Sequence, residues 1–93
     1  MIFFFDKRTA HVARGRAARG IPSKVAVRAA RQIDILSAAA TLDEARFAGH
    51  GRIAKAPRTK PPRFYLHVHG RWWIGFNWER SNACSVKLEE KKR

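Results

Sequence analysis

The side chains best suited to chemistry lie between residues 63 and 78. Apolar and polar residues alternate there, a pattern that predicts β-strands with one buried and one exposed face. The expected exposed face carries Tyr65, His67 and Trp73. An imidazole exchanges protons near neutral pH, and aromatic rings stack on unpaired bases. We therefore expect His67 to be a proton-transfer group or, alternatively, an exposed strand histidine with no catalytic role.

This segment is expected to form a hairpin in which His67 lies directly opposite Trp73. The register requires a three-residue loop at residues 69–71, because a two-residue loop would mismatch the apolar side chains. Tyr65 and Trp73 then either stack on bases or cover a second, minor core. The apolar pairs expected on the other face are Val68 with Trp72, Leu66 with Ile74 and Phe64 with Phe76.

The chain is strongly basic. Lys and Arg total 20 and Asp and Glu total 7, so the formal net charge is +13. The cations run through the expected helices and strands rather than forming a tail, which favours a contoured anion-binding surface. Nucleic acid, an acidic protein and an anionic membrane surface all remain as partners.

Length and cysteine content limit the number of domains and the expected cellular location. Ninety-three residues allow one domain, over residues 1–93, with a single core. No apolar run approaches the roughly 20 residues that cross a bilayer, and residues 1–5 are too short for a signal-peptide core. Cys84 is the only cysteine, so an internal disulfide is excluded and a cytoplasmic location is expected.

The flanking elements are expected to be one strand and two helices. Residues 2–5 read as a short buried strand, and Asp6 as the N-cap of a helix over about 7–18. Ser23 is expected to cap a second helix, whose exposed side carries Lys24, Arg28 and Arg31. Its expected buried stripe is Val25, Ala29, Ile33, Leu36 and Ala40.

Shorter elements complete the pattern. Thr41 and Glu44 match a capping box, in which each side chain binds the amide of the other, and one helical turn should follow. Residues 52–56 read as a short strand, and Cys84, Val86 and Leu88 as a last strand, with Cys84 directed to the core. The expected fold class is therefore α+β: one strand and two helices, followed by an antiparallel meander of three to four strands.

This order resembles the RelE superfamily of toxins, and most closely its HigB-like, plasmid maintenance system killer branch. That branch opens with Met-Ile-x-x-Phe, where residues 1–5 read MIFFF. Its Leu-Asp-Asp-Leu-Arg is similar to LDEAR at 42–46, and its Gly-Asn-Arg-Leu to HGRI at 50–53. Its hairpin, Tyr-Ser-Ile-Arg-Ile-Asn-x-x-Trp-Arg-Ile-x-Phe-x-Trp, matches FYLHVHGRWWIGFNW at 64–78 without a gap.

The resemblance implies an endoribonuclease, the toxin of a type II toxin–antitoxin system, which cuts messenger RNA on the ribosome. It implies a HigA-like helix-turn-helix antitoxin as partner, and neither a membrane nor a small-molecule cofactor nor a metal. Such cleavage uses the neighbouring 2′-hydroxyl as nucleophile, so the site needs a base, an acid and cations. The expected catalytic residues are His67, Lys55, Arg58 and Tyr65, and the expected RNA-binding residues are Arg52, Lys60, Arg63, Arg71, Trp73, Lys91 and Lys92.

The sequence departs from the branch where the chemistry would lie. Pro57-Arg58 replaces a Lys-Gly, His67 and Trp73 each replace an arginine, and residues 90–92 replace a closing Asp-Tyr-His. These departures support an alternative: a catalytically impaired RNA- or ribosome-binding protein on the same scaffold. For any single one of Lys55, Arg58, Lys60 and Arg63, the alternative is a solvated position on a basic loop with no role in the site.

Four further interpretations are weaker. His67 and His69 with Cys84 lack the spaced ligands of a metal site, and a core-facing Cys84 would be inert as a nucleophile. A DNA-binding module is disfavoured because no helix pairs with a turn-linked partner and starts with base-reading side chains. Arg14, Arg16 and Arg19 would bind ribosomal RNA or simply be solvated.

Overall fold

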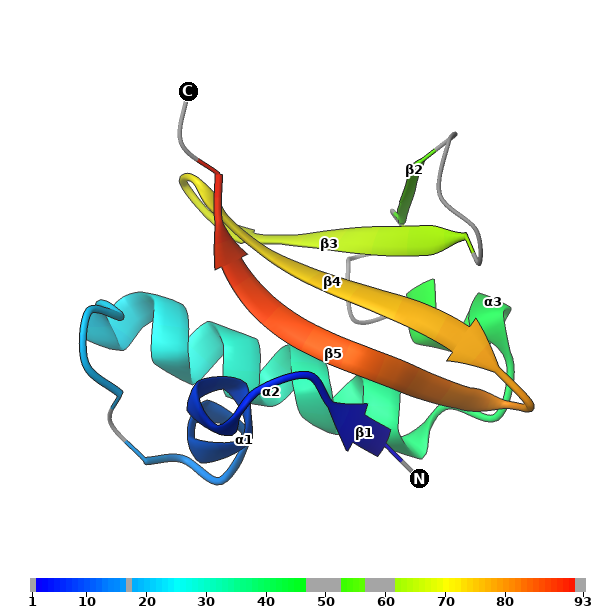
Figure 1. Ribbon diagram of the computed structural model, residues 1–93, viewed down its shortest axis with the longest axis horizontal. Helices are drawn as coiled ribbons and strands as arrows, with labels where there is room; N and C mark the ends of the chain where they lie inside the picture. The colour runs from blue at the N-terminus through cyan, green and yellow to red at the C-terminus, as the bar shows by residue number, and fades with distance from the viewer. Residues whose placement is uncertain (1, 17, 47–52, 57–61, 92–93) are drawn as a thin grey trace.

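The computed structural model describes residues 2–16, 18–46, 53–56 and 62–91, and within these ranges it has three helices and one five-stranded sheet (Figure 1). The helices are α1 (Lys7–Ala13), α2 (Ser23–Ala38) and α3 (Leu42–Ala45). The strands are β1 (Ile2–Phe4), β2 (Ala54–Ala56), β3 (Arg63–His69), β4 (Trp72–Glu79) and β5 (Asn82–Glu90).

The sheet has the strand order β1-β5-β4-β3-β2. Strands β2 to β5 form an antiparallel meander, and β1 joins the far edge parallel to β5. The parallel pairing is possible because α1 and α2 lie between β1 and the meander in the chain. The α+β class expected from the sequence is confirmed, and the meander, for which three to four strands were expected, has four.

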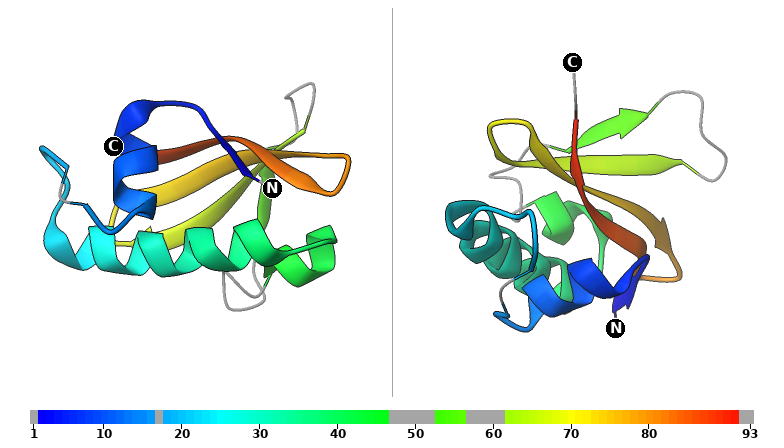
Figure 2. Two further views of the ribbon diagram at one scale, coloured as in Figure 1. Left: turned by 90° about the horizontal axis from the view of Figure 1, so that it is seen from below. Right: turned by 60° about the vertical axis from the view of Figure 1, so that its left-hand side comes forward.

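Helices α1 and α2 lie against the same face of the sheet, as both views in Figure 2 show. The core fills the space between these two layers, because each element has one apolar side to bury. The largest fully buried side chains are Phe76, Leu36, Leu66, Ile74 and Leu88. We call the other side of the sheet the outer face; among the described residues, no helix packs on it.

Helix α1 is shorter than expected, because it ends at Ala13 rather than near residue 18. Gly15 has a φ of 75°, the left-handed conformation that favours glycine and stops a helix. Asp6 is the N-cap as expected, and its carboxylate accepts a hydrogen bond from the Thr9 amide at 2.8 Å. Thr9 is buried and its hydroxyl accepts from the Leu88 amide at 3.0 Å, which joins α1 to β5.

Helix α2 largely follows the predicted stripe. Val25, Ala29, Ile33 and Leu36 are buried. The helix ends at Ala38, and Ala39 rather than the expected Ala40 is buried after it. The N-cap is Pro22 and makes no side-chain hydrogen bond, so the predicted capping role of Ser23 is wrong.

The capping box before α3 is formed only in part. The Thr41 hydroxyl accepts from the Glu44 amide at 3.2 Å, as expected. The Glu44 carboxylate accepts from the Ala40 amide at 2.7 Å, one residue before the amide of the standard motif. The single helical turn that was expected here is confirmed as α3.

The hairpin of β3 and β4 has the predicted pairs His67 with Trp73, Leu66 with Ile74 and Phe64 with Phe76. Its loop differs: His69 pairs with Trp72, so two residues, Gly70 and Arg71, connect the strands. A β-bulge at Val68 absorbs the mismatch, which keeps both Val68 and Trp72 buried. The expectation of a three-residue loop is therefore wrong, although the pairs beyond the bulge are unaffected.

A second bulge, in β5, reverses the expected direction of Cys84. Gly75 pairs with Lys87 and Asn77 with Cys84, so one extra residue of β5 lies opposite Phe76. Ser85, at this bulge, has a φ of 50°. Ala83, Val86 and Leu88 consequently face the core, and Cys84 lies on the outer face, half-buried.

Strand β1 is an edge strand rather than the buried strand expected. Phe3 is 49% and Phe5 61% exposed, whereas Ile2 and Phe4 pack against the core. The Lys87 ammonium lies 4.8 Å from the centre of the Phe5 ring. One strand partner and partial helix cover leave every second side chain of β1 in water.

Candidate functional site

The candidate site is built from three rows of residues that cross the outer face. Directly opposed residues in neighbouring strands lie about 5 Å apart and share a face. The first row is His67, Trp73 and Glu89, the second is Tyr65, Gly75 and Lys87, and the third is Arg63, Asn77 and Cys84. The hairpin register therefore brings Tyr65, His67 and Trp73 together on one exposed face, as the sequence predicted.

His67 is exposed, and two contacts fix its ring. The imidazole packs edge-on against Trp73, with ring centres 4.9 Å apart and planes at 62°. Its Nε2 lies 2.9 Å from the carbonyl oxygen of Gly70. A carbonyl oxygen can only accept, so Nε2 carries the proton in this bond. The neutral ring then presents Nδ1 as its proton acceptor, and the charged ring presents an Nδ1–H donor.

The main chain beneath this ring is held by α2. The Gln32 side-chain amide donates a hydrogen bond to the carbonyl oxygen of His67 at 2.9 Å. This carbonyl is available because β2 pairs with β3 only at Arg63, Phe64 and Tyr65. Gln32 is buried among apolar neighbours, so the bond forms away from bulk water. The helix layer thus positions the strand segment that carries the imidazole.

Lys91 supplies a cation next to these rings. Its ammonium lies 4.3 Å from the centre of the Tyr65 ring and 4.8 Å from that of Trp73. The Lys91 amide donates to the carbonyl oxygen of Arg71 at 2.8 Å, which continues the pairing of β5 with the hairpin by one residue. An ammonium over two aromatic faces is attracted by both quadrupoles, so the two rings hold this cation on the outer face.

Arg63 has a supporting position. Its guanidinium donates to the Asn77 side-chain oxygen at 2.9 Å and to the Ser85 carbonyl at 3.1 Å. It also lies 6.0 Å from the centre of the Tyr65 ring. These contacts hold the guanidinium flat across β4, so Arg63 stabilises the Tyr65 end of the site.

Gly75 forms a narrow floor under these side chains. A Cβ at this position would lie 2.6 Å from Glu89 Oε2 and 2.9 Å from Tyr65 Cε1. The missing side chain is what allows Glu89 and Tyr65 to approach across β4. Glu89 Oε2 is buried and has no hydrogen-bond partner among the described residues.

Glu89 was missed by the sequence interpretation, which ended the last strand at Leu88. Its position follows from the length of β4. That strand begins at Trp72, and its antiparallel partner β5 extends to Glu90, which pairs with Trp72. Alternation from Val86 and Leu88 then places Lys87, Glu89 and Lys91 on the outer face.

Lys55 is not brought to this site. It pairs with Phe64, which packs against the core, so Lys55 lies on the helix side of the sheet and is exposed there. Arg71 is exposed at the tip of the hairpin, four residues after His67 and at the end of the outer face. The other predicted cations, Arg52, Arg58, Lys60 and Lys92, lie outside the described residues.

Cys84 lies at the opposite end of the outer face from His67. Their partners on β4, Asn77 and Trp73, are four residues apart, or about 13 Å. Burial, followed by the charge of Glu79, raises the pKa of the Cys84 thiol, while a backbone hydrogen bond at Glu79 opposes the shift. A raised pKa disfavours the thiolate that a nucleophile or metal ligand requires.

No group of three or more histidine, cysteine or acidic residues that could hold a metal ion occurs in the described part of the chain. Comparison with models of known protein families gives no match, and a search of curated proteins gives none either. None of the described helices is both long enough and apolar enough to span a bilayer.

Groups suited to three chemical roles lie close together on the outer face. His67 can accept or donate a proton at Nδ1, Lys91 can stabilise negative charge, and Tyr65 and Trp73 offer rings to unpaired bases. Tyr65, His67 and Trp73 lie on strands, which position side chains better than a loop does, and Lys91 directly follows the last residue of β5. This set suits proton transfer next to a bound anion, with aromatic rings for a flat ligand to stack on.

Proposed function

We propose that the chain is a metal-independent endoribonuclease of the HigB-like branch of the RelE superfamily. In this proposal it is the cytoplasmic toxin of a type II toxin–antitoxin pair, which cuts messenger RNA on the ribosome and so inhibits translation. The observation that carries the proposal is the cluster on the outer face, where His67 adjoins Trp73 and Lys91 bridges Trp73 and Tyr65. A HigA-like antitoxin would act by covering this cluster.

The proposed reaction begins with a message strand laid across the outer face, with bases stacked on Tyr65 and Trp73. Each stacked base contributes about 1–3 kcal/mol to binding. His67 Nδ1 removes the proton from the 2′-hydroxyl, whose oxygen attacks the adjacent phosphorus. The Lys91 ammonium neutralises charge on the phosphate as it becomes five-coordinate. The P–O5′ bond then breaks, which leaves a 2′,3′-cyclic phosphate on one fragment. The leaving 5′-oxygen takes a proton from water and becomes a 5′-hydroxyl end, and the His67 imidazolium returns its proton to the solvent.

The net charge of +13 supports binding to a polyanion as large as the ribosome with its message. Charges spread over a folded surface favour association with RNA at low salt, because each phosphate contact releases condensed counterions. This support is general to RNA. The assignment to cleavage depends on His67.

The test is primer extension on message recovered from a translating extract that contains the purified protein. We expect new 5′ ends inside the coding region, and these ends should require phosphorylation before ligation because they carry a 5′-hydroxyl. The control is the same message in an extract whose initiation is blocked, where no new ends should form. An intact message at high protein concentration would remove the claim of enzymatic activity.

A second function is a non-catalytic RNA- or ribosome-binding protein on the same scaffold. It is favoured by the placement of the cations, because Lys55 lies on the helix side and the Arg63 guanidinium is directed to Asn77 and Ser85. This alternative predicts binding and inhibition of translation with no new RNA ends. The same primer extension therefore separates the two functions.

A further inference from the structure

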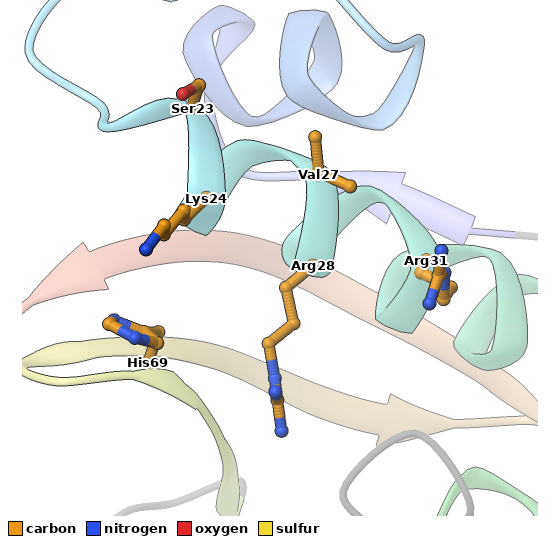
Figure 3. Close-up of a pocket in the computed structure, with 6 residues that line it drawn as sticks. All are labelled: Ser23, Lys24, Val27, Arg28, Arg31 and His69. Carbon is orange, nitrogen blue, oxygen red and sulfur yellow. The ribbon is translucent and has the colours of Figure 1, made fainter.

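A hollow on the helix side of the molecule lies between α2 and the end of β3 (Figure 3). Its volume is about 450 Å³, and its lining residues are Ser23, Lys24, Val27, Arg28, Arg31 and His69. Four of these six carry a basic group, and none is acidic. The hollow is separate from the outer face and takes no part in the reaction proposed above.

The basic residues gather because of helix periodicity. Lys24, Arg28 and Arg31 have the spacing i, i+4, i+7, which places them on one side of α2 within about 10 Å along its axis. All three are exposed. In Figure 3 the Lys24 side chain points toward His69, and Arg28 extends from the helix in the direction of the sheet.

Like charges this close on one helix repel one another. This repulsion destabilises the helix when no ligand is bound. The nearest acidic residue on α2 is Asp34, which is exposed one turn beyond Arg31 and is not among the lining residues. The beginning of α2 adds positive potential, because its N-cap Pro22 makes no side-chain hydrogen bond to the first-turn amides. Each of these features becomes favourable when an anion binds.

The hollow is adjacent to the outer face around the open edge of β3. Strand β2 covers this edge only as far as Tyr65, and within the described residues no strand pairs there with residues 66–69. His67 lies on the outer face, and His69, two residues further along the same strand, lines the hollow. Among the described residues, a single chain of phosphates therefore has a path from one to the other around this edge.

We infer that this hollow is a second phosphate-binding subsite, in which Lys24, Arg28, Arg31 and His69 hold the backbone of an RNA strand whose neighbouring segment lies on the outer face. The inference rests on the proposed RNA-binding function but not on cleavage. Cations that neutralise phosphates add affinity without reading sequence, and each raises the dependence of binding on salt. The subsite would fix the direction in which the strand reaches His67.

The experiment measures binding of a short, fluorescein-labelled 2′-O-methyl RNA by anisotropy over a range of salt concentrations. The methyl group blocks the nucleophile, so binding is read whether or not the protein cleaves. The test variant is Arg28→Gln with Arg31→Gln. The matched control is Lys7→Gln with Arg80→Gln, which removes the same charge at two exposed positions outside the hollow. Trp73→Ala serves as the outer-face variant, and circular dichroism confirms the fold of each protein.

Each phosphate contact contributes about 0.7 to the slope of log K against log salt for a single strand. We expect the test variant to lose about 1.4 from this slope, and the control to keep the wild-type slope. Equal slopes in test and control, with binding weakened by Trp73→Ala, would overturn the subsite and leave the proposed function standing. Absence of binding by the wild-type protein would contradict both. An acidic peptide that binds through Arg28 and Arg31, while the RNA slope is unchanged, would assign the hollow to a protein partner and also overturn the inference.

Discussion

The side-chain amide of Gln32 in α2 donates a hydrogen bond of 2.9 Å to the main-chain carbonyl of His67 in β3. This bond joins the helix layer to the sheet at His67, whose imidazole on the outer face can both accept and donate a proton. The imidazole points away from the helices, and its backbone is held by one of them. Packing beneath the sheet and chemistry above it are therefore linked at one residue.

Replacing Gln32 with Leu should lower the free energy of unfolding by about 1 kcal/mol, because the His67 carbonyl loses its partner. Urea denaturation measures this change as a lower midpoint at constant slope. Asp34→Leu is the matched control, since Asp34 is exposed on the same helix and should change stability by less than about 0.5 kcal/mol. Equal midpoints for the two variants would show that the bond contributes no more to stability than the buried, unpaired Gln32 Oε1 costs.

Removal of the Trp73 ring should weaken RNA binding. Trp73→Ala deletes a base-stacking surface and one of the two rings that hold Lys91, so we expect roughly a tenfold loss, within the range of about 1–3 kcal/mol per stacked base. The control is Phe3→Ala, which removes an exposed aromatic ring from the edge strand β1. Anisotropy with a labelled single-stranded RNA gives both affinities. Equal losses in the two variants would remove the special role of Trp73.

Gly75 should not tolerate alanine. The new Cβ would lie 2.6 Å from Glu89 Oε2 and 2.9 Å from Tyr65 Cε1, so both side chains must move. We expect a loss of about 1–3 kcal/mol in the free energy of unfolding, the usual cost of overpacking. Adding Glu89→Ala to Gly75→Ala should restore part of it, because the closest of three contacts disappears; the third is with Arg63 Nη2 at 3.0 Å. A single Gly75→Ala variant as stable as the wild type would contradict the described floor of the site.

The thiol of Cys84 should react slowly at neutral pH. Burial and the negative charge of Glu79 raise its pKa, so at any given pH the thiolate fraction is smaller than in the unfolded chain. The rate of alkylation by iodoacetamide, followed against pH, should rise with a midpoint above that of the denatured protein. Glu79→Gln removes the charge and should move the midpoint down. A midpoint at or below the denatured value would contradict the burial of this side chain.

The sequence predicted the positions where periodicity alone decides the outcome. Alternation in the hairpin placed Tyr65, His67 and Trp73 on one face, and the helical stripe placed Val25, Ala29 and Ile33 in the core. Both patterns follow from burial of one side of a regular element. Such patterns persist when the ends of the element change.

The errors lie where one extra residue breaks a period. The bulge at Val68 replaced a three-residue loop, and the bulge at Ser85 moved Cys84 from the core to the outer face. A bulge depends on pairing with a neighbouring strand, so alternation along one strand cannot show it. The early end of α1 at Ala13 was missed for a similar reason. The left-handed conformation of Gly15 depends on the surrounding chain and not on the helical period.

The site was predicted in part for a similar reason. The rings and His67 belong to one hairpin, whose register is local. The separation of Lys55 from them depends on the pairing of β2, and the contribution of Glu89 depends on how far β5 extends along β4. The pairing of β2 depends on a neighbouring strand. The end of β5 is not marked by any residue pattern in that strand itself.

The most direct test of the central claim is cleavage of message by His67→Ala beside His11→Ala, each added to a translating extract and followed by primer extension. His11 is exposed on α1 and contacts none of the outer-face residues discussed above, so its variant controls for loss of an imidazole. We expect His67→Ala to cut at least about 100-fold more slowly, because it lacks the proton-transfer group, and His11→Ala to cut at the wild-type rate. Cleavage by folded His67→Ala at the wild-type rate would contradict the account.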